Sequence, residues 1–181
     1  MPIDVQDALI NPLAVANEIR ARNHNIEAAE VEIAAEATCR CARRLFAILA
    51  FIKQGAEIYS LLKEGVSDED LPLERKRDGK GEFTLRRMSG IPIETFERWN
   101  EYDIEVFDRT QWWMIAPVFE NTEHYELDDG VILPFIPFKT NPDTERKREG
   151  GYSEVYAVRI HPAHHRFWKR SEFEVWVTTP D

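Results

Sequence analysis

The chain has 181 residues, of which 43% are hydrophobic and 31% charged, and this composition is that of a globular protein rather than a disordered tail. Its formal net charge of −10 disfavours nucleic acid and anionic lipid as partners, because both repel an acidic surface. The most apolar run, residues 45–52, is far shorter than the roughly 20 residues of a membrane-spanning helix, so no membrane span is expected.

The N-terminal half carries the strongest helix signals. Asn11 and Pro12 are typical of a helix start, which predicts a helix over residues 12–21. Between Ile26 and Gly55 the chain contains neither glycine nor proline, and apolar residues recur at helical spacing over residues 41–52. We therefore expect a long helix there, with its apolar face packed into a core, a break near Gly55 and a left-handed cap at Gly65.

Two cysteines, Cys39 and Cys41, lie inside that predicted helix, where residues two apart point to different faces. They are expected to be buried and reduced. The small number of cysteines and the acidic start of the chain, without a basic and apolar export signal, predict a cytoplasmic or nuclear protein.

The middle of the chain alternates between turns and helices. Residues 67–70 resemble a capped turn, and residues 72–81 are highly charged and predict an exposed, mobile loop. The cationic run 74–80 within this loop is either solvated or in contact with a phosphate or an acidic partner. Helices are expected over residues 93–100 and 102–115. In the second, Ile104, Phe107, Met114 and Val118 share one face, and Trp112 and Trp113 are expected to anchor it.

After residue 117 the sequence is typical of strands. Residues 131–138 predict an edge strand interrupted by prolines, and residues 152–160 and 173–178 predict two further strands. The connector 161–170 is basic. Its imidazoles, together with two nearby carboxylates, suit zinc, although a solvated connector is the simpler interpretation; these residues are His161, His164, His165, Glu172 and Glu174. The fold class is α+β, with a helical domain over residues 1–125 and a small antiparallel β segment over residues 126–181.

Several motifs carry a family resemblance. The segments LDDGVILPFI (residues 127–136), GGYSEVYAV (150–158) and VYAVRIHPAHH (155–165) occur in the order found in a group of fungal serine/threonine protein-kinase-like proteins. Over roughly residues 35–167 the chain resembles the N-terminal part of that group. The resemblance implies a helical extension that leads into the first strands of a kinase small lobe.

The resemblance also implies a nucleotide site at a glycine-rich loop. Gly150 and Gly151 match the loop, Tyr152 matches the aromatic residue at its tip, and Val155 matches the valine that contacts adenine. In such loops small residues let backbone amides approach phosphates. The sequence departs from the pattern at three places. Arg148 and Ser153 replace two expected glycines, and the third strand has no lysine near Trp176 or Thr178.

The chain contains neither His-Arg-Asp nor Asp-Phe-Gly, the motifs that supply the catalytic and metal-binding aspartates of kinases. We therefore expect a truncated, non-catalytic protein that binds a protein partner as an interaction or regulatory module, without a metal or cofactor of its own. One alternative is the N-terminal fragment of a kinase that binds ATP and magnesium only when the rest of the domain is present. Another is a small helical effector that self-associates or acts at a membrane surface through residues 45–52.

Overall fold

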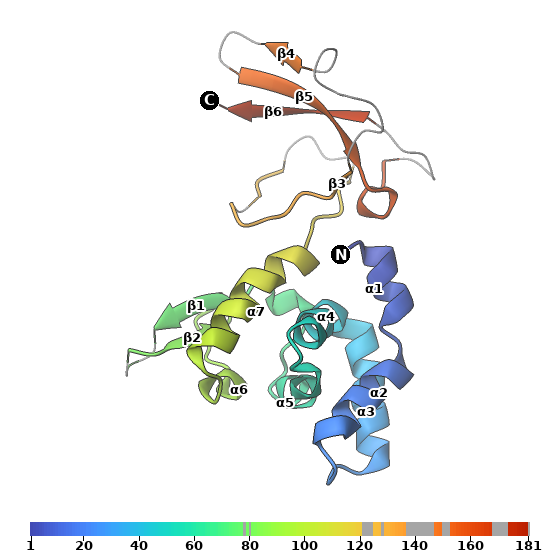
Figure 1. The fold of residues 1–181 in the computed structure, drawn as a ribbon, viewed down its shortest axis with the longest axis vertical. Coiled ribbons are helices and arrows are strands. Elements are labelled where there is room, and N and C mark those ends of the chain that lie inside the picture. The colour runs from blue at the N-terminus through green and yellow to red at the C-terminus, as the bar shows by residue number, and fades with distance from the viewer. Residues whose placement is uncertain are drawn as a thin grey trace. The chain divides into compact units, whose positions relative to one another are not determined.

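The computed structural model of the chain describes residues 1–77, 79, 81–120, 125–127, 129–136, 147–149, 153–167 and 174–180, and for 147–149, 153–157 and 174–180 it describes the backbone alone. The contacts divide the chain into two compact units (Figure 1). Unit 1 comprises Ile3–Ile115 with Met1, and unit 2 comprises Ala116–Asp181 with Pro2. The expected α+β class is confirmed. The domain boundary expected after residue 125 stays a prediction.

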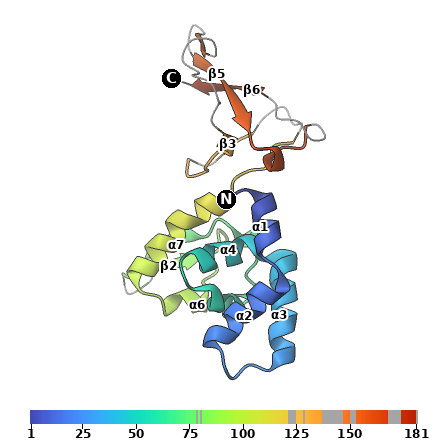
Figure 2. The same cartoon turned by 45° about the vertical axis from the view of Figure 1, so that its right-hand side comes forward.

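Unit 1 begins with α1 (Ile3–Leu9) and α2 (Pro12–Arg22), and α2 confirms the helix predicted over residues 12–21. The Oδ1 atom of Asn11 accepts the backbone N–H of Ala14 at 3.0 Å, which satisfies one of the donors that a helix start leaves free. Val15 and Ile19 of α2 are fully buried. Helix α2 packs along α3, as Figures 1 and 2 both show.

The single helix expected from Ile26 toward Gly55 is wrong, because the chain forms two helices there. Helix α3 covers Ala28–Cys41 and α4 covers Arg43–Phe51. Between them, Ala42 leaves the helical conformation with φ −140° and ψ 31°. The predicted core packing of the apolar run is confirmed in α4, where Leu45, Phe46, Ala47, Ile48 and Leu49 are buried. No helix formed by the described residues has the length and apolar character needed to cross a bilayer.

The break expected near Gly55 is present. Three residues form the 3₁₀ turn η1 (Gly55–Glu57), and α5 (Ile58–Lys63) follows directly. After α5, Gly65 has φ +69°, which confirms the predicted left-handed cap. The capped turn expected over residues 67–70 is also confirmed as η2 (Asp68–Asp70), where the side chain of Ser67 accepts the N–H of Glu69 and that of Asp70 accepts the N–H of Ser67.

The expectation of a mobile loop over residues 72–81 is wrong, because this segment contains the first strand of a hairpin. Strands β1 (Glu74–Arg77) and β2 (Phe83–Arg86) pair antiparallel, with Arg77 opposite Phe83. Leu73, just before β1, is 2% exposed, and its backbone N–H and C=O both bond the side chain of Gln111. One buried apolar residue and this long-range pairing hold the charged strand in place.

The last helices of unit 1 are α6 (Glu94–Glu97), shorter than the predicted 93–100, and α7 (Glu101–Met114), close to the predicted 102–115. Asn100 caps α7 by accepting the N–H of Asp103 at 2.9 Å. Its buried face includes Ile104, Phe107 and Met114 as expected, whereas Val118 lies beyond the helix. Of the two tryptophans expected to anchor α7, Trp112 is half-buried. Trp113 is 40% exposed, although its ring meets that of Phe51 in α4 edge to face, with centroids 5.6 Å apart.

The core of unit 1 lies between the helices and the inner face of the hairpin. Its fully buried side chains come from elements spread across the whole unit, so no single helix hairpin accounts for it. The largest of them are Ile19, Leu45, Ile48, Leu49, Ile58, Leu61, Leu73, Leu85, Ile93, Phe96, Ile104 and Phe107.

Unit 2 holds an antiparallel sheet whose central strand is β5 (Ser153–Ile160). This strand pairs with β3 (Phe135–Ile136), β4 (Lys147–Glu149) and β6 (Glu174–Pro180). The strands expected over residues 152–160 and 173–178 are confirmed within the described residues. Within the described part of the edge strand expected over residues 131–138, which is residues 131–136, β3 covers two residues. The 3₁₀ turn η3 (Pro162–His164) follows β5.

Candidate functional site

The nucleotide site implied by the glycine-rich loop falls mostly outside the described residues, because Gly150, Gly151 and Tyr152 are among those that the structure leaves out. Val155 lies in β5, where its backbone is opposite Arg148 of β4 and Thr178 of β6. The candidate nucleotide site at these four residues therefore stays a prediction.

The expectation of a solvated connector is wrong for its described part, residues 161–167, where two histidines are buried. His164 and His165 are buried, at 3% and 8% exposure. The Nδ1 atom of His164 lies 2.9 Å from the carbonyl oxygen of Pro117. Phe119 also donates its N–H to the His164 carbonyl and accepts the N–H of Arg166, both at 2.8 Å, so the connector pairs with residues 117–119 as a short strand would. Among the described residues, no three histidine, cysteine or acidic side chains lie close enough to hold a metal ion.

The two cysteines are both free thiols in α3, as expected, but only one of them has a sheltered position. Cys39 is half-buried, and this burial raises the pKa of its thiol. Cys41 is exposed, which contradicts the expectation of two buried cysteines. The difference in exposure follows from the helix period, because residues two positions apart, such as Cys39 and Cys41, point to different faces of α3.

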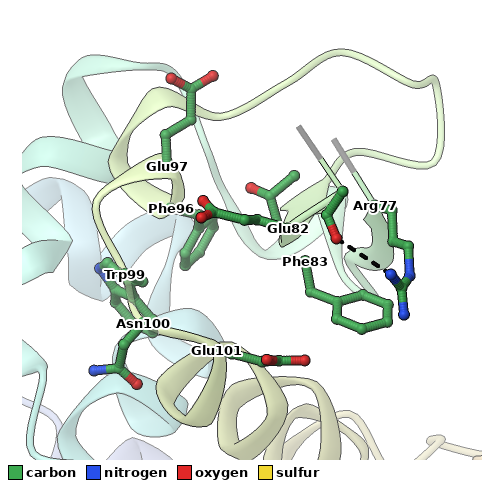
Figure 3. A pocket seen from close by; sticks show the side chains of 10 residues that line it. Arg77, Glu82, Phe83, Phe96, Glu97, Trp99, Asn100 and Glu101 are labelled. Carbon is green, nitrogen blue, oxygen red and sulfur yellow. Dashed lines mark hydrogen bonds between the residues drawn. The ribbon is translucent and has the colours of Figure 1, made fainter. Parts of the chain in front are cut away.

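A hollow of about 380 Å³ lies between the hairpin and the start of α7, and we call it the hairpin pocket (Figure 3). Two parts of the chain build it, residues 77 and 81–84 of the hairpin and residues from 96 to 101, which run from α6 to the start of α7. Its lining residues are Arg77, Gly81, Glu82, Phe83, Thr84, Phe96, Glu97, Trp99, Asn100 and Glu101.

Aromatic rings anchored in the core form one side of the hairpin pocket. Phe96 is 1% exposed and meets the ring of Trp99 edge to face, with ring centroids 4.9 Å apart. Both rings also contact Phe107 of α7, at centroid distances of 5.3 and 6.1 Å. The three rings meet edge to face at interplanar angles of 81°, 66° and 72°, so contacts with the core hold Trp99 at the pocket.

The opposite side of the pocket is the ring of Phe83, which two arginines of β1 contact. The guanidinium carbons of Arg75 and Arg77 lie 4.0 and 4.6 Å from the centroid of this ring. Arg77 also donates to the carbonyl of Gly81 at 3.3 Å, the bond drawn in Figure 3. These contacts hold Arg75 and Arg77 in place. Both arginines belong to the cationic run 74–80, which was expected to be solvated or in contact with a phosphate or an acidic partner.

Carboxylates surround the aromatic sides. Glu82, Glu97 and Glu101 are all exposed at the pocket, and Figure 3 shows Glu97 and Glu101 at opposite ends of it. Glu101 also lies 3.8 Å from the guanidinium of Arg75. Thr84, a polar side chain that lines the pocket, is only 7% exposed. Arg75 and Arg77 already contact the Phe83 ring, so the groups that would attract a further guanidinium or ammonium group are the carboxylates and the half-buried ring of Trp99.

Sequence reasoning missed the hairpin pocket, although one signal was present. Asp78-Gly79 and Gly81 are turn-forming residues, and they precede the strand-like run at residues 82–87. The density of charge over residues 74–80 masked this signal. The partner that holds Phe83 comes from the same strand pair, so the hairpin was readable locally, whereas the contact with Trp99 was not.

Comparisons with known proteins add no assignment to this geometry. No protein-family model matches the chain, and neither a curated protein nor a solved structure matches it. The resemblance to fungal kinase-like proteins therefore stays a prediction, and the fold and the hairpin pocket define the chain only as an α+β protein with an acidic, aromatic hollow.

Proposed function

We propose that the protein is a non-catalytic interaction module and that it binds a basic side chain of a protein partner in the hairpin pocket. One observation carries this proposal. A hollow with the rings of Phe83 and Trp99 on its sides and three glutamates around it lies on a folded unit. A cation that enters such a hollow gains a contact with the ring of Trp99 and charge-assisted hydrogen bonds to the glutamates, beside the two arginines that already contact Phe83.

The electrostatics of the whole chain support a basic partner. The formal charge of −10 attracts cationic segments over several ångströms before contact, and this attraction mainly accelerates association. Arginine fits the pocket better than lysine, because its planar group stacks on an aromatic ring and bonds a carboxylate at the same time.

The pocket is also suited to recognition because it is built on a rigid base. Phe96 and Phe107 are at most 1% exposed, and Trp99 packs on both of them. A site that is held in shape before binding loses less conformational freedom when the partner arrives. The kinase-like interpretation is compatible with this role, and we propose a cytoplasmic or nuclear location from the small number of cysteines.

A test uses short peptides and the full chain. A nine-residue peptide of Gly and Ser with three arginines is titrated into isotopically labelled protein, and the NMR signals of Trp99 and Phe83 are followed. We expect these signals to shift, and the affinity to fall about tenfold when the arginines are replaced by citrulline, which is neutral. Equal affinity for the two peptides would refute the proposal.

The matched variants are Glu97→Gln with Glu101→Gln for the pocket and Glu105→Gln as a control. Glu105 is an exposed acidic residue on α7 that does not line the pocket. We expect the double variant to weaken arginine binding and the control to leave it within about twofold, since exposed charges away from the site contribute little.

A second candidate function is nucleotide binding by unit 2. The observation in its favour is the antiparallel pairing of β5 with β6 on either side of the His-rich connector, with Val155 opposite Thr178. A thermal-shift titration with ATP and magnesium tests it, because a ligand that binds only the folded state at 100 times its Kd adds about 2.7 kcal/mol to stability. An unchanged Tm at millimolar ATP would remove this candidate.

A further inference from the structure

The last residue of β1, Arg77, lies against the ring that forms one side of the hairpin pocket (Figure 3). Its guanidinium carbon is 4.6 Å from the centroid of the Phe83 ring, and carboxylates line the same hollow. An aromatic ring beside carboxylates is also what the pocket is proposed to offer to the arginine of a partner. The protein therefore holds one of its own arginines in contact with part of that site.

The register of the hairpin places Arg77 there. Its backbone is directly opposite Phe83, and the side chains of directly opposite residues lie on the same face of a strand pair. Arg75 is two residues earlier in β1, so it lies on that face as well, and its guanidinium carbon is 4.0 Å from the ring centroid. Two arginines therefore share one ring because side chains alternate along the strand.

The two arginines differ in how firmly they are held. The side chain of Arg75 is 24% exposed, and its guanidinium lies 3.8 Å from the carboxylate of Glu101. Arg77 is exposed, and it forms no ion pair with any residue that the structure describes. Besides the ring contact, it donates to the carbonyl of Gly81 at 3.3 Å, which is longer than most hydrogen bonds of this kind. Arg77 is thus the arginine that a ligand can displace.

Loss of the Arg77 contact is easily offset. A cation on an exposed aromatic ring is held weakly, and its guanidinium is hydrated again once it leaves the ring. A partner's arginine in the same place would make the ring contact and, in addition, a charge-assisted hydrogen bond to a carboxylate, which Arg77 does not make. The exchange of one arginine for the other therefore favours the partner.

We propose that Arg77 is a built-in competitor for the hairpin pocket. It contacts Phe83 while the pocket is free, and the arginine of a partner displaces it and gains this ring in addition to that of Trp99. The inference rests on the proposed function of the pocket and concerns how binding there is regulated. Its consequence is that Arg77 lowers the affinity for every ligand that needs the Phe83 ring, so a ligand must also bond the carboxylates in order to bind well.

The experiment titrates the same arginine peptide into the labelled wild type and into the variant Arg77→Gln. We expect the variant to bind the peptide about threefold more tightly or better, because no exposed arginine of the protein then competes for the ring. The matched control is Lys76→Gln. It removes the same charge from the neighbouring residue of β1, an exposed lysine that does not line the pocket, and it should leave the affinity within about twofold.

A second variant, Arg77→Lys, separates competition for the ring from repulsion between like charges. It keeps the positive charge but removes the planar group that stacks on the ring. Competition predicts that Arg77→Lys binds the peptide more tightly than the wild type and less tightly than Arg77→Gln, whereas repulsion alone predicts the affinity of the wild type. In the wild type, nuclear Overhauser contacts between the side chain of Arg77 and the Phe83 ring should disappear when the peptide saturates the protein.

Lys76 and Arg77 are exposed, so their variants should fold, and circular dichroism spectra check this. Equal binding by the wild type and Arg77→Gln, an equal gain for Lys76→Gln, or ring contacts that persist at saturation would overturn the inference and leave the proposed function standing. Binding by Arg77→Gln but not by the wild type would support the inference, because Arg77 would then close the pocket. If neither protein binds the peptide, the proposed function fails and this inference fails with it.

Discussion

The carboxylate of Asp68 accepts the backbone N–H of Leu45 at 2.8 Å, across 23 residues of sequence, and that of Arg44 at 3.0 Å. These are N–H groups of the first turn of α4, which have no partner within the helix. The residue before α4 is Ala42, whose side chain has no acceptor. A carboxylate from η2 therefore performs the capping that the local sequence does not provide.

Removal of this cap should destabilise unit 1. We expect Asp68→Ala to lower the free energy of unfolding by about 1–2 kcal/mol, because two N–H groups at the start of α4 lose their acceptor. Urea denaturation monitored by circular dichroism measures the change. The control is Glu69→Ala at the exposed neighbouring residue, which should remain within about 0.5 kcal/mol of the wild type. Similar losses for the two variants would show that the cap contributes nothing.

The same residue makes stability depend on pH. Burial raises the pKa of Asp68 above its usual value of 3.8, although the N–H groups of Arg44 and Leu45 act in the opposite direction. The folded state therefore binds this proton more tightly than the unfolded state. The stability that results is fully present below pH 3.8 and is lost as the pH rises through the raised pKa.

The measurement compares the wild type with Asp68→Asn, which does not titrate, in urea from pH 3.5 to 7. The free energy of unfolding of the wild type minus that of the variant should decrease with rising pH across the window above 3.8. Burial also raises the pKa of Asp108, so the difference between the two proteins, and not the wild-type curve, isolates Asp68. A difference that increases with pH would contradict this assignment.

The side chain of Gln111 bonds both backbone groups of Leu73, as a neighbouring strand would, and this provides a further test. Its Oε1 accepts the N–H of Leu73 at 2.8 Å, and its Nε2 donates to the carbonyl of Leu73 at 2.9 Å. We expect Gln111→Ala to cost about 2–4 kcal/mol, because both buried backbone groups would lose their partner. The exposed residue Arg109 on the same helix provides the control, and Arg109→Ala should behave like the wild type in urea.

Gly65 tests a purely local conformational requirement. Its φ of +69° is disfavoured for residues with a Cβ, and nothing lies within 4 Å of the place that a Cβ would occupy. Gly65→Ala should therefore lose about 1 kcal/mol through backbone strain alone. Gly65→Asn should lose less, because asparagine adopts this conformation more readily. Equal unfolding free energies for the Ala and Asn variants, measured by thermal denaturation, would contradict this explanation.

Local signals were read correctly where the interaction partners are near neighbours in sequence. The Asn11 cap, the turn at Ser67 and the left-handed glycine at position 65 each depend on residues within one helical turn. The strand at 153–160 was likewise predicted from its alternation. The prediction of a mobile loop over residues 72–81 was wrong, because Leu73 and Phe83 hold the hairpin through contacts that its composition does not reveal.

The sequence by itself thus determined the α+β class, the start of α2 and the apolar face of α4, since periodicity and capping act over a few residues. Only the tertiary structure decided that Asp68 caps the second of two helices where one was expected, and that Phe83 and Trp99 line the same hollow. Both depend on contacts between distant segments. Such contacts form only when burial of the shared core has brought those segments together.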